Sequence, residues 1–433
     1  MKQVSQAVGA IASCLSVAAA FAQAPVVSDV VMTQDANRKV TVTYRLDRPA
    51  VVTLGIETNV SGTADWVSIG GENLTHVTGD ANVFVRETDS SVVHTIRWEP
   101  CVAWPNHRIK DGGVRAVVRA WAPEAPPDWM LIDLSLASNV HYYASLGELP
   151  HGHPTNSVYK LDKMLMRKIP AAGRSFRMGI SSGEARQYEG KGDDFLTVSS
   201  QCEPRLVSFT NDYYIAIYPF TQHQYFNCMD ENPPGYDQDK VAPYDECPQA
   251  YLSYARLRGE DKATANWPTL GHSVGPGYRI DAIRRKCGVE VDFPTEAQWE
   301  YACRAGEPRL RPDGACLYTD AGLDAIAWHS GNSGGKIHPV GLKAPNAWGL
   351  YDMIGNGAEW VLDWYRDGYG GCGTLEPIGP DSPRESGLRV LRGGTQNADA
   401  RYMTSFYRSF GFEGSYDAMT SVTFRLAAPA VAK

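Results

Sequence analysis

Two blocks of sequence decide the fold. The first, FPTEAQWEYACRAG, covers residues 293–306, and the second, NAWGLYDMIGNGAEW, covers residues 346–360. The first block predicts a short helix, because Thr295 is suited to cap its start and Gln298 to reach back as the partner in a capping box. Gly306 is suited to end that helix, since glycine enters the left-handed conformation at little steric cost. The second block predicts a glycine turn between polar residues.

Two shorter motifs follow in order along the chain. RVLRGGT covers residues 389–395 and FRLA covers residues 424–427. Together with the two blocks above, and with a predicted strand, turn and strand over residues 165–179, these motifs resemble the sulfatase-modifying factor, or formylglycine-generating enzyme, family. The resemblance implies a mixed α+β, loop-rich, C-type-lectin-like domain, which we expect to cover residues 155–428.

The bulk composition is that of a globular protein with more than one domain. The chain has 433 residues, of which 43% are hydrophobic and 21% are charged, and two domains are the default expectation at this length. Its formal charge is −8, and no basic run offers a footprint for phosphates, so a nucleic-acid partner is not expected. After the N-terminal leader, no apolar run approaches the roughly 20 residues that span a bilayer.

The leader predicts export. Residues 1–24 carry Lys2 ahead of an apolar stretch and end in Ala-Gln-Ala, which together predict a cleaved signal peptide and a periplasmic or extracellular location. An alternative takes Cys14 as the lipidated residue of a lipoprotein, but the polar residues before it make a poor hydrophobic region.

An exported chain with an even number of cysteines is able to form disulfides. Cys228 and Cys247 bracket a loop rich in Pro, Gly and Asp and are the predicted local pair, and Cys372 is a further disulfide partner for Cys316 or a buried thiol. No CxxC spacing indicates a zinc or thioredoxin-like site. Eight cysteines remain after cleavage: Cys101, Cys202, Cys228, Cys247, Cys287, Cys303, Cys316 and Cys372.

The region ahead of the family-like domain is predicted to be a small β-sandwich. Short strands separated by turns indicate an all-β sandwich of immunoglobulin or fibronectin type over residues 25–135. Residues 136–154 are predicted to be a linker, in which His151 and His153 are more simply solvated than metal ligands. The predicted strands are residues 40–45, 50–56, 83–87, 92–98 and 114–121.

The aromatic segment after the first strands of the larger domain contains Tyr218, Phe220 and Tyr225. We expect these rings to pack in the core and not to bind a ligand.

In the family that this chain resembles, the glycine turn holds a calcium ion. The resemblance therefore implies one calcium, bound by the side chains of Asp352 and Glu359 and by the carbonyls of Gly355 and Gly357. Carboxylates and carbonyls at a flexible turn are oxygen ligands of the kind that calcium prefers. The residues themselves leave an alternative open, in which Asp352 caps a turn and Glu359 pairs with an arginine.

Formylglycine-generating enzymes oxidise a substrate cysteine with oxygen and use two active-site cysteines that bind copper. The resemblance places those cysteines at Ala398 and Met403, and neither residue forms a thiolate. Because soft sulfur ligands select Cu(I), copper is not expected. Two further positions, Thr395 and Ala358, also differ from the family pattern, and Cys372 is the nearest other thiol in the sequence.

Two functions follow as hypotheses. In the first, the domain is a binding scaffold for a peptide, protein or glycan, and the sandwich is a spacer or a second binding surface. In the second, the protein is an oxidoreductase of the family with altered chemistry, although the charged residues near the glycine pair are more simply a salt network. The candidate pocket comprises Thr395, Ala398, Asp399, Arg401, Tyr402, Met403 and Arg408.

Overall fold

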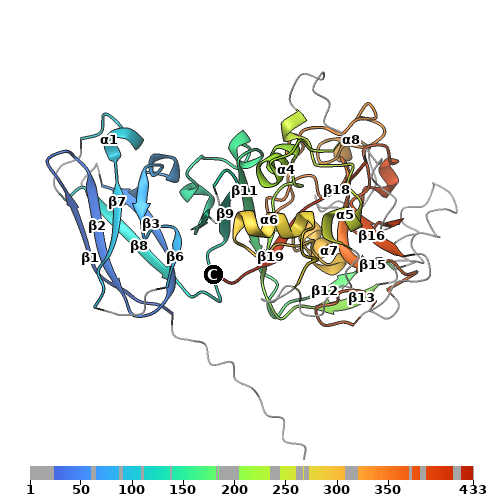
Figure 1. The fold of residues 1–433 in the computed structure, drawn as a ribbon, viewed down its shortest axis with the longest axis horizontal. Coiled ribbons are helices and arrows are strands. Elements are labelled where there is room, and N and C mark those ends of the chain that lie inside the picture. Colours follow the sequence, from blue (N-terminus) through green and yellow to red (C-terminus); the bar gives the residue numbers. More distant parts are fainter. Residues whose placement is uncertain are drawn as a thin grey trace, which may run out of the picture.

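A computed structural model of the chain consists of a smaller β unit beside a larger mixed unit (Figure 1). The predicted signal peptide and Cys14 lie outside the residues that the structure describes. Those residues are 24–59, 65–86, 91–108, 112–136, 139–181, 184, 204–234, 244–259, 267, 273–307, 320–369, 373–380, 387–412 and 421–432.

The smaller unit consists of two sheets that share one core. One sheet has the order β1-β2-β7-β5, with β1 at Val27–Gln34, β2 at Val40–Leu46, β7 at His94–Trp98 and β5 at Val77–Gly79. The other has the order β4-β3-β6, with β4 at Val67–Ser68, β3 at Ala50–Thr58 and β6 at Val83–Val85, and β8 at Val114–Trp121 pairs with β3. The helix α1, at Pro100–Ala103, follows β7.

The alternation of side chains explains this sandwich. In β2 every second residue is buried, because successive side chains of a strand point to opposite faces. All five predicted strands are present, whereas β1, β4 and β5 were not predicted. The register of β1 against β2 shifts between Ser28 and Val31, which breaks the alternation that would have revealed β1. The immunoglobulin or fibronectin type of the sandwich stays a prediction.

The boundary between the two units lies earlier than the sequence predicts. Two strands, β9 (Trp129–Asp133) and β10 (Asn139–Tyr143), were placed in the sandwich and in the linker, but both belong to a sheet of the larger unit. That sheet has the order β10-β9-β11-β14-β19, in which β11 is Lys163–Ile169, β14 is Tyr213–Ala216 and β19 is Ala427–Pro429. The sandwich contacts it directly, since the Tyr142 amide donates to the Asn82 carbonyl at 2.7 Å.

The remaining elements surround this sheet. A second sheet has the order β17-β16-β15-β18, with β17 at Arg408–Phe412, β16 at Leu388–Arg392, β15 at Ala358–Trp364 and β18 at Val422–Phe424. The strands β12 (Ser175–Met178) and β13 (Arg205–Ser208) form a pair. The helices are α4 at Gln222–Met229, α5 at Tyr254–Arg258, α6 at Arg279–Cys287, α7 at Glu296–Arg304 and α8 at Asp320–Asp324. Short 3-10 helices are η1 at Gly71–Asn73, η2 at Leu146–Glu148, η3 at Ser157–Tyr159, η4 at Tyr244–Glu246 and η5 at Ala400–Tyr402.

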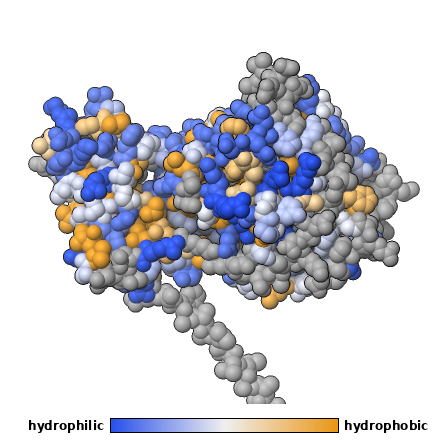
Figure 2. Space-filling view, in the orientation of Figure 1, coloured by the Kyte–Doolittle hydropathy of each residue, from blue (hydrophilic) through white to orange (hydrophobic). Residues whose placement is uncertain are grey.

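The five-stranded sheet separates two hydrophobic cores. Leu131, Leu165 and Ile215 belong to one core, and their sequence neighbours belong to the other, as expected for a sheet buried on both faces. The predicted core residues Tyr218, Phe220 and Tyr225 are all buried, which confirms that prediction. On the visible surface, hydrophobic and hydrophilic residues are interspersed, with orange atoms gathered on the sandwich at the left of Figure 2.

The helix predicted from the first block is present as α7. Its capping box is complete: the Thr295 hydroxyl accepts from the Gln298 amide at 3.2 Å, and the Gln298 side chain accepts from the Thr295 amide at 2.9 Å. The predicted end is shifted by one residue, because Ala305 takes the left-handed conformation at the C-cap with φ 50° and Gly306 follows with φ 84°. Glycine is thus the second left-handed residue and not the cap.

The predicted disulfide between Cys228 and Cys247 is wrong, since neither cysteine forms a disulfide. The Cys247 carbonyl accepts from the Gln222 amide at the first residue of α4, whereas Cys228 lies six residues further along the same helix. Cys247 is therefore held at the start of α4, and Cys228 lies about 9 Å further along the helix axis. Cys202, Cys316 and Cys372 lie outside the described residues.

In the part of the chain that the structure describes, no helix has the length and apolar composition needed to cross a membrane.

Candidate functional site

The second block forms a tight turn organised by Asn356. This residue adopts a positive φ of 61°, and its side chain donates to the His338 carbonyl at 3.0 Å and accepts from the His338 amide at 2.9 Å. Its backbone amide donates to the Trp328 carbonyl, and its carbonyl accepts from the Gln396 amide. Asn356 therefore ties three separate segments to the turn. Asn356 was not among the predicted site residues, although an asparagine between two glycines is a signal for a left-handed conformation.

The glycines of the turn permit close packing. Gly355 has a positive φ of 76°, and a Cβ there would lie 2.3 Å from the Trp328 carbonyl oxygen. At Gly357 a Cβ would lie 2.5 Å from the side chain of Thr423. Only residues without a side chain fit these two positions.

Glu359 is buried and paired with an arginine. Arg425 donates to both carboxylate oxygens of Glu359 at 2.7 Å, and the indole N–H of Trp299 donates to the same carboxylate at 2.7 Å. Arg425 is also fully buried and donates to the carbonyl of Tyr351. This arrangement confirms the alternative that the sequence left open for Glu359.

Asp352 lies at the other end of the turn, also with a positive φ, of 51°. Its carboxylate accepts from the Gly341 amide at 2.7 Å, and burial raises the pKa of Asp352 to about 6. A cavity of about 10 Å³, also bordered by Asn346 and Met353, lies against it. That volume is about enough for a single water-sized molecule.

These residues do not fit the predicted calcium site well. Calcium takes six to eight oxygen ligands, and one of the two carboxylates is already neutralised by Arg425. Within the described residues, no group of three or more His, Cys, Asp or Glu side chains is placed to hold a metal ion. The calcium expected from the family resemblance is not tested by these contacts, which favour a turn held by the Glu359–Arg425 pair without an ion, and no part of the proposed function depends on calcium.

The segment after the glycine pair contains most of the candidate pocket. The carbonyls of Thr395 and Ala398 accept from the amides of Ala398 and Ser330 respectively, so the loop is held to its surroundings by its backbone. Met403 is fully buried in the hydrophobic core, whereas Ala398 is partly buried against that core. The position predicted for one copper-binding cysteine is therefore a packed core position.

The polar members of this segment interact with one another. The Asp399 carboxylate caps η5 by accepting from the Arg401 amide at 3.0 Å, and the Arg401 guanidinium lies 3.6 Å from the same carboxylate. The Arg401 guanidinium also lies over the ring of Tyr402, at 5.1 Å from its centroid. Asp399 is exposed, so these residues form a local surface network.

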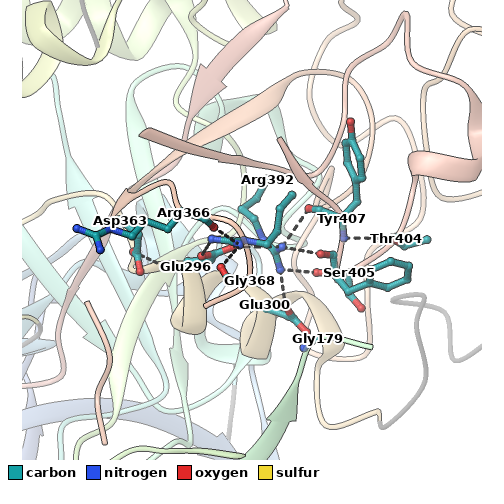
Figure 3. Close-up of polar contacts among 12 residues, drawn as sticks. Gly179, Glu296, Glu300, Asp363, Arg366, Gly368, Arg392, Thr404, Ser405 and Tyr407 are labelled. Carbon is teal, nitrogen blue, oxygen red and sulfur yellow. Dashed lines mark hydrogen bonds and ion pairs between the residues drawn. The ribbon is translucent and has the colours of Figure 1, made fainter. Parts of the chain in front are cut away.

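Arg408 does not belong to the predicted pocket. It is buried and donates to both carboxylate oxygens of Glu296, at 2.5 and 2.9 Å, within a buried ion network. In the same network Arg392 donates to Glu300 at 2.5 Å (Figure 3). The sequence could not place Arg408 opposite α7, because the pairing joins residues 112 positions apart.

Asp363 adds a further carboxylate to this network. It accepts from the amide of Glu296 at 2.7 Å (Figure 3). Burial, together with the neighbouring Glu296 carboxylate, raises the pKa of Asp363 to about 7.

The described cysteines do not replace the missing thiols. Cys303 shares the hydrophobic core with Met403, but it is fully buried, and burial raises the pKa of its thiol far above the ordinary value. A buried thiol of this kind is inert as a nucleophile and as a metal ligand.

The chain belongs to the family of the Sulfatase-modifying factor enzyme 1-like domain, which it matches over residues 169–430. The predicted domain, residues 155–428, therefore overlaps the matched region almost completely. The predicted resemblance is confirmed at the level of the family.

Curated relatives match part of the chain. The formylglycine-generating enzyme of Bos taurus is 33% identical over 158 residues, which are 34% of this chain and 41% of that protein. The formylglycine-generating enzyme of Mus musculus is 33% identical over 188 residues, which are 38% of this chain and 49% of that protein. The chain thus spans less than half the length of these two relatives. The chaperone protein LppX of Paenibacillus barcinonensis is 25% identical over 237 residues, which are 47% of this chain and 76% of that protein.

Two solved structures are similar to parts of the chain. The Treponema denticola variable protein 1 is 25% identical, with a TM-score of 0.45, and the match covers 62% of this chain and 95% of that one. PvdO from Pseudomonas aeruginosa is 22% identical, with a TM-score of 0.46, and the match covers 61% of this chain and 94% of that one.

Proposed function

We propose that this chain is an exported binding protein in which the family domain has lost the copper-binding cysteine pair and is used as a scaffold. The ligand class is a peptide, a protein or a glycan. The sandwich is a spacer or a second binding surface, because none of its strands carries a catalytic motif.

The observation that carries this proposal is the environment of Met403. Its side chain is fully buried, and a Cβ on Gly394 would lie 2.9 Å from the Met403 methyl group. The Met403 thioether, which packs against the glycine pair, therefore puts an apolar group where the family has a cysteine thiolate. Ala398 offers no soft ligand, so the two positions together supply no Cu(I) thiolate pair.

A related protein supports a binding role. The LppX protein of Paenibacillus barcinonensis, of which this chain covers 76%, is described as a chaperone protein. A chaperone acts by binding other proteins, and such a role needs a surface but no metal.

An alternative is an oxidoreductase of the same family that uses the site differently. Asp399, Arg401 and Tyr402 would be its polar residues. Their contacts favour the scaffold, because the Arg401 guanidinium is already engaged with the carboxylate of Asp399 and with the ring of Tyr402. Arg408 forms a buried ion pair with Glu296, which argues against a catalytic role for Arg408, because its guanidinium is already bound.

A copper titration tests the proposal. The full chain is titrated with Cu(I) in competition with a chromogenic chelator, beside the double variant Ala398→Cys/Met403→Cys. We expect the wild type to leave the chelator complex intact and the double variant to gain one tight copper equivalent, because two thiolates favour Cu(I). One tight copper in the wild type would contradict the proposal. Variants in which the cysteines outside the described residues, such as Cys372, are replaced by serine would then identify its ligands.

A further inference from the structure

A second site is present at the start of α4. A cavity of about 250 Å³ lies there, apart from the glycine pair and lined by side chains from α4 and from the loops on either side of residues 235–243. Among the residues that the structure describes, those that line the cavity include no lysine or arginine, and no function proposed above uses it. The lining residues are Gln222, His223, Phe226, Asn232, Pro233 and Asp245.

Gln222 leaves a hydrogen-bonding group unsatisfied at this cavity. Its side chain is only 8% exposed, and among the described residues its Oε1 atom has no hydrogen-bond partner. A buried polar atom without a hydrogen-bond partner is destabilising, and most buried polar atoms in folded proteins have one.

The charge at the cavity is negative. His223 lies between two carboxylates, 3.3 Å from Asp162 and 3.9 Å from Asp245. Among the described residues, neither carboxylate is paired with a lysine or an arginine, whereas the adjacent Glu246 is paired with Lys160 at 3.1 Å. Asp245 lines the cavity and is half exposed, so its charge is available to a ligand.

The helix start does not favour an anion instead. The backbone N–H of Gln222 donates to the Cys247 carbonyl at 3.0 Å, and that of Gln224 donates to the Thr221 hydroxyl at 3.2 Å. Two of the N–H groups that would bind an anion at the start of α4 are therefore engaged within the protein.

Phe226 supplies an aromatic surface. It lies one turn along α4 from Gln222, lines the cavity, and is 42% exposed, which is unusual for a large apolar side chain. An aromatic face attracts a cation that lies over it, and a guanidinium group also stacks on it. Pro233 is buried and adds an apolar wall against which a hydrocarbon stem packs.

We propose that this cavity binds an organic cation, a guanidinium or primary ammonium group on an apolar stem. The cation donates to the carboxylate of Asp245 and lies over the ring of Phe226, beside the side chain of Gln222. This inference goes beyond the scaffold function and does not depend on it, because the two sites share no residue. An experiment that rejects cation binding at this cavity would not reject the scaffold function, and the reverse also holds.

Calorimetric titration of the full chain with butylguanidinium tests the proposal, with butylurea as the neutral analogue of the same shape. We expect a single site for the cation and binding of butylurea that is weaker by about tenfold or more, because hydrogen bonds to a charged group are the stronger ones. Equal binding of the two compounds, binding of neither, or binding of methyl glucoside in preference to both would overturn the proposal.

Substitutions locate the site. Asp245→Asn and Phe226→Ala should each weaken butylguanidinium binding by about fivefold or more, since each removes one attraction to the cation. Asp65→Asn, which removes an exposed carboxylate of the sandwich, is the matched control and should leave the affinity unchanged. Unaltered binding in both cavity variants would show that the cation binds elsewhere and would overturn the assignment. Phe226 is exposed, so its replacement keeps the test valid if Asp245→Asn does not fold.

The source of the cation is distinguished with a blocked Gly-Arg-Gly peptide. Binding of the peptide as tightly as butylguanidinium assigns the cavity to an arginine side chain of a protein ligand. Binding of butylguanidinium with no binding of the peptide assigns it to a free small-molecule cation.

Discussion

Arg425, three residues after the start of β18, donates to both carboxylate oxygens of Glu359 on β15 at 2.7 Å. The two residues come from separate sequence motifs, and both are buried. The parallel pairing of β15 with β18, in which Glu359 lies opposite Thr423, brings the motifs together. The ion pair therefore joins the glycine turn to the end of the domain.

Removing the charge of Glu359 should destabilise the protein strongly. Glu359→Gln leaves Arg425 buried without its counter-ion, which we expect to lower the free energy of unfolding by about 3–5 kcal/mol. Urea denaturation followed by tryptophan fluorescence measures it. The matched control is Glu99→Gln, which breaks the exposed ion pair with Lys39 and should leave the unfolding midpoint unchanged. Equal stability of the two variants would contradict the role assigned to Glu359.

Calcium should have little effect on stability. Because Arg425 already neutralises Glu359, we expect melting curves recorded with millimolar calcium and with a chelator to coincide. Differential scanning fluorimetry makes this comparison. A higher Tm in calcium would restore the predicted calcium site. If that increase also disappears in Asp352→Asn, the Asp352 side chain would be one of the ligands.

Asn356 should be required for the conformation of the turn. Asn356→Ala loses two side-chain hydrogen bonds and places a Cβ in the left-handed region, which we expect to cost about 2–4 kcal/mol of stability. Asn356→Gly loses the same hydrogen bonds without the backbone strain, so it should be the more stable of the two variants. Chemical denaturation of both proteins gives the comparison, and an alanine variant as stable as the wild type would contradict the account.

Asp363 should make stability depend on pH. Its pKa is about 7 in the folded protein and near 4 in an unfolded chain. Between these values the folded state binds more protons, so the contribution of this group to the free energy of unfolding falls as pH rises. Asp363→Asn cannot titrate, and its stability relative to the wild type should increase by about 1–3 kcal/mol from pH 4 to pH 8. Denaturation at several pH values measures the difference, and a constant difference would refute the prediction.

Local signals in the sequence predicted local structure. The capping box of Thr295 and Gln298 involves residues three positions apart, and alternation within a strand such as β2 is visible over seven residues. Such features depend on residues that are close together in the sequence. The helix and the five sandwich strands were therefore predicted from residue types alone. The family resemblance depends on motifs of the same short range.

Long-range pairing was not predictable in the same way. The sequence does not show that β9 leaves the sandwich to pair with β10 and β11, because a strand buried on both faces has no alternation to indicate its partner. The partners of Arg408 and Arg425 lie 112 and 66 positions away, so their roles emerged only from the fold. The Gln222 cavity likewise requires α4 and the loop that carries Asp245 to be placed together.

Under the proposed function, the family domain of this chain does not oxidise a peptide cysteine in a copper-dependent reaction. The most direct test incubates the purified full chain with copper, oxygen and a peptide containing Cys-x-Pro-x-Arg, with an active formylglycine-generating enzyme as the positive control. Mass spectrometry follows the peptide cysteine. We expect the cysteine to be unchanged by this protein and converted by the control, whereas formylglycine formed by this protein would overturn the proposed function.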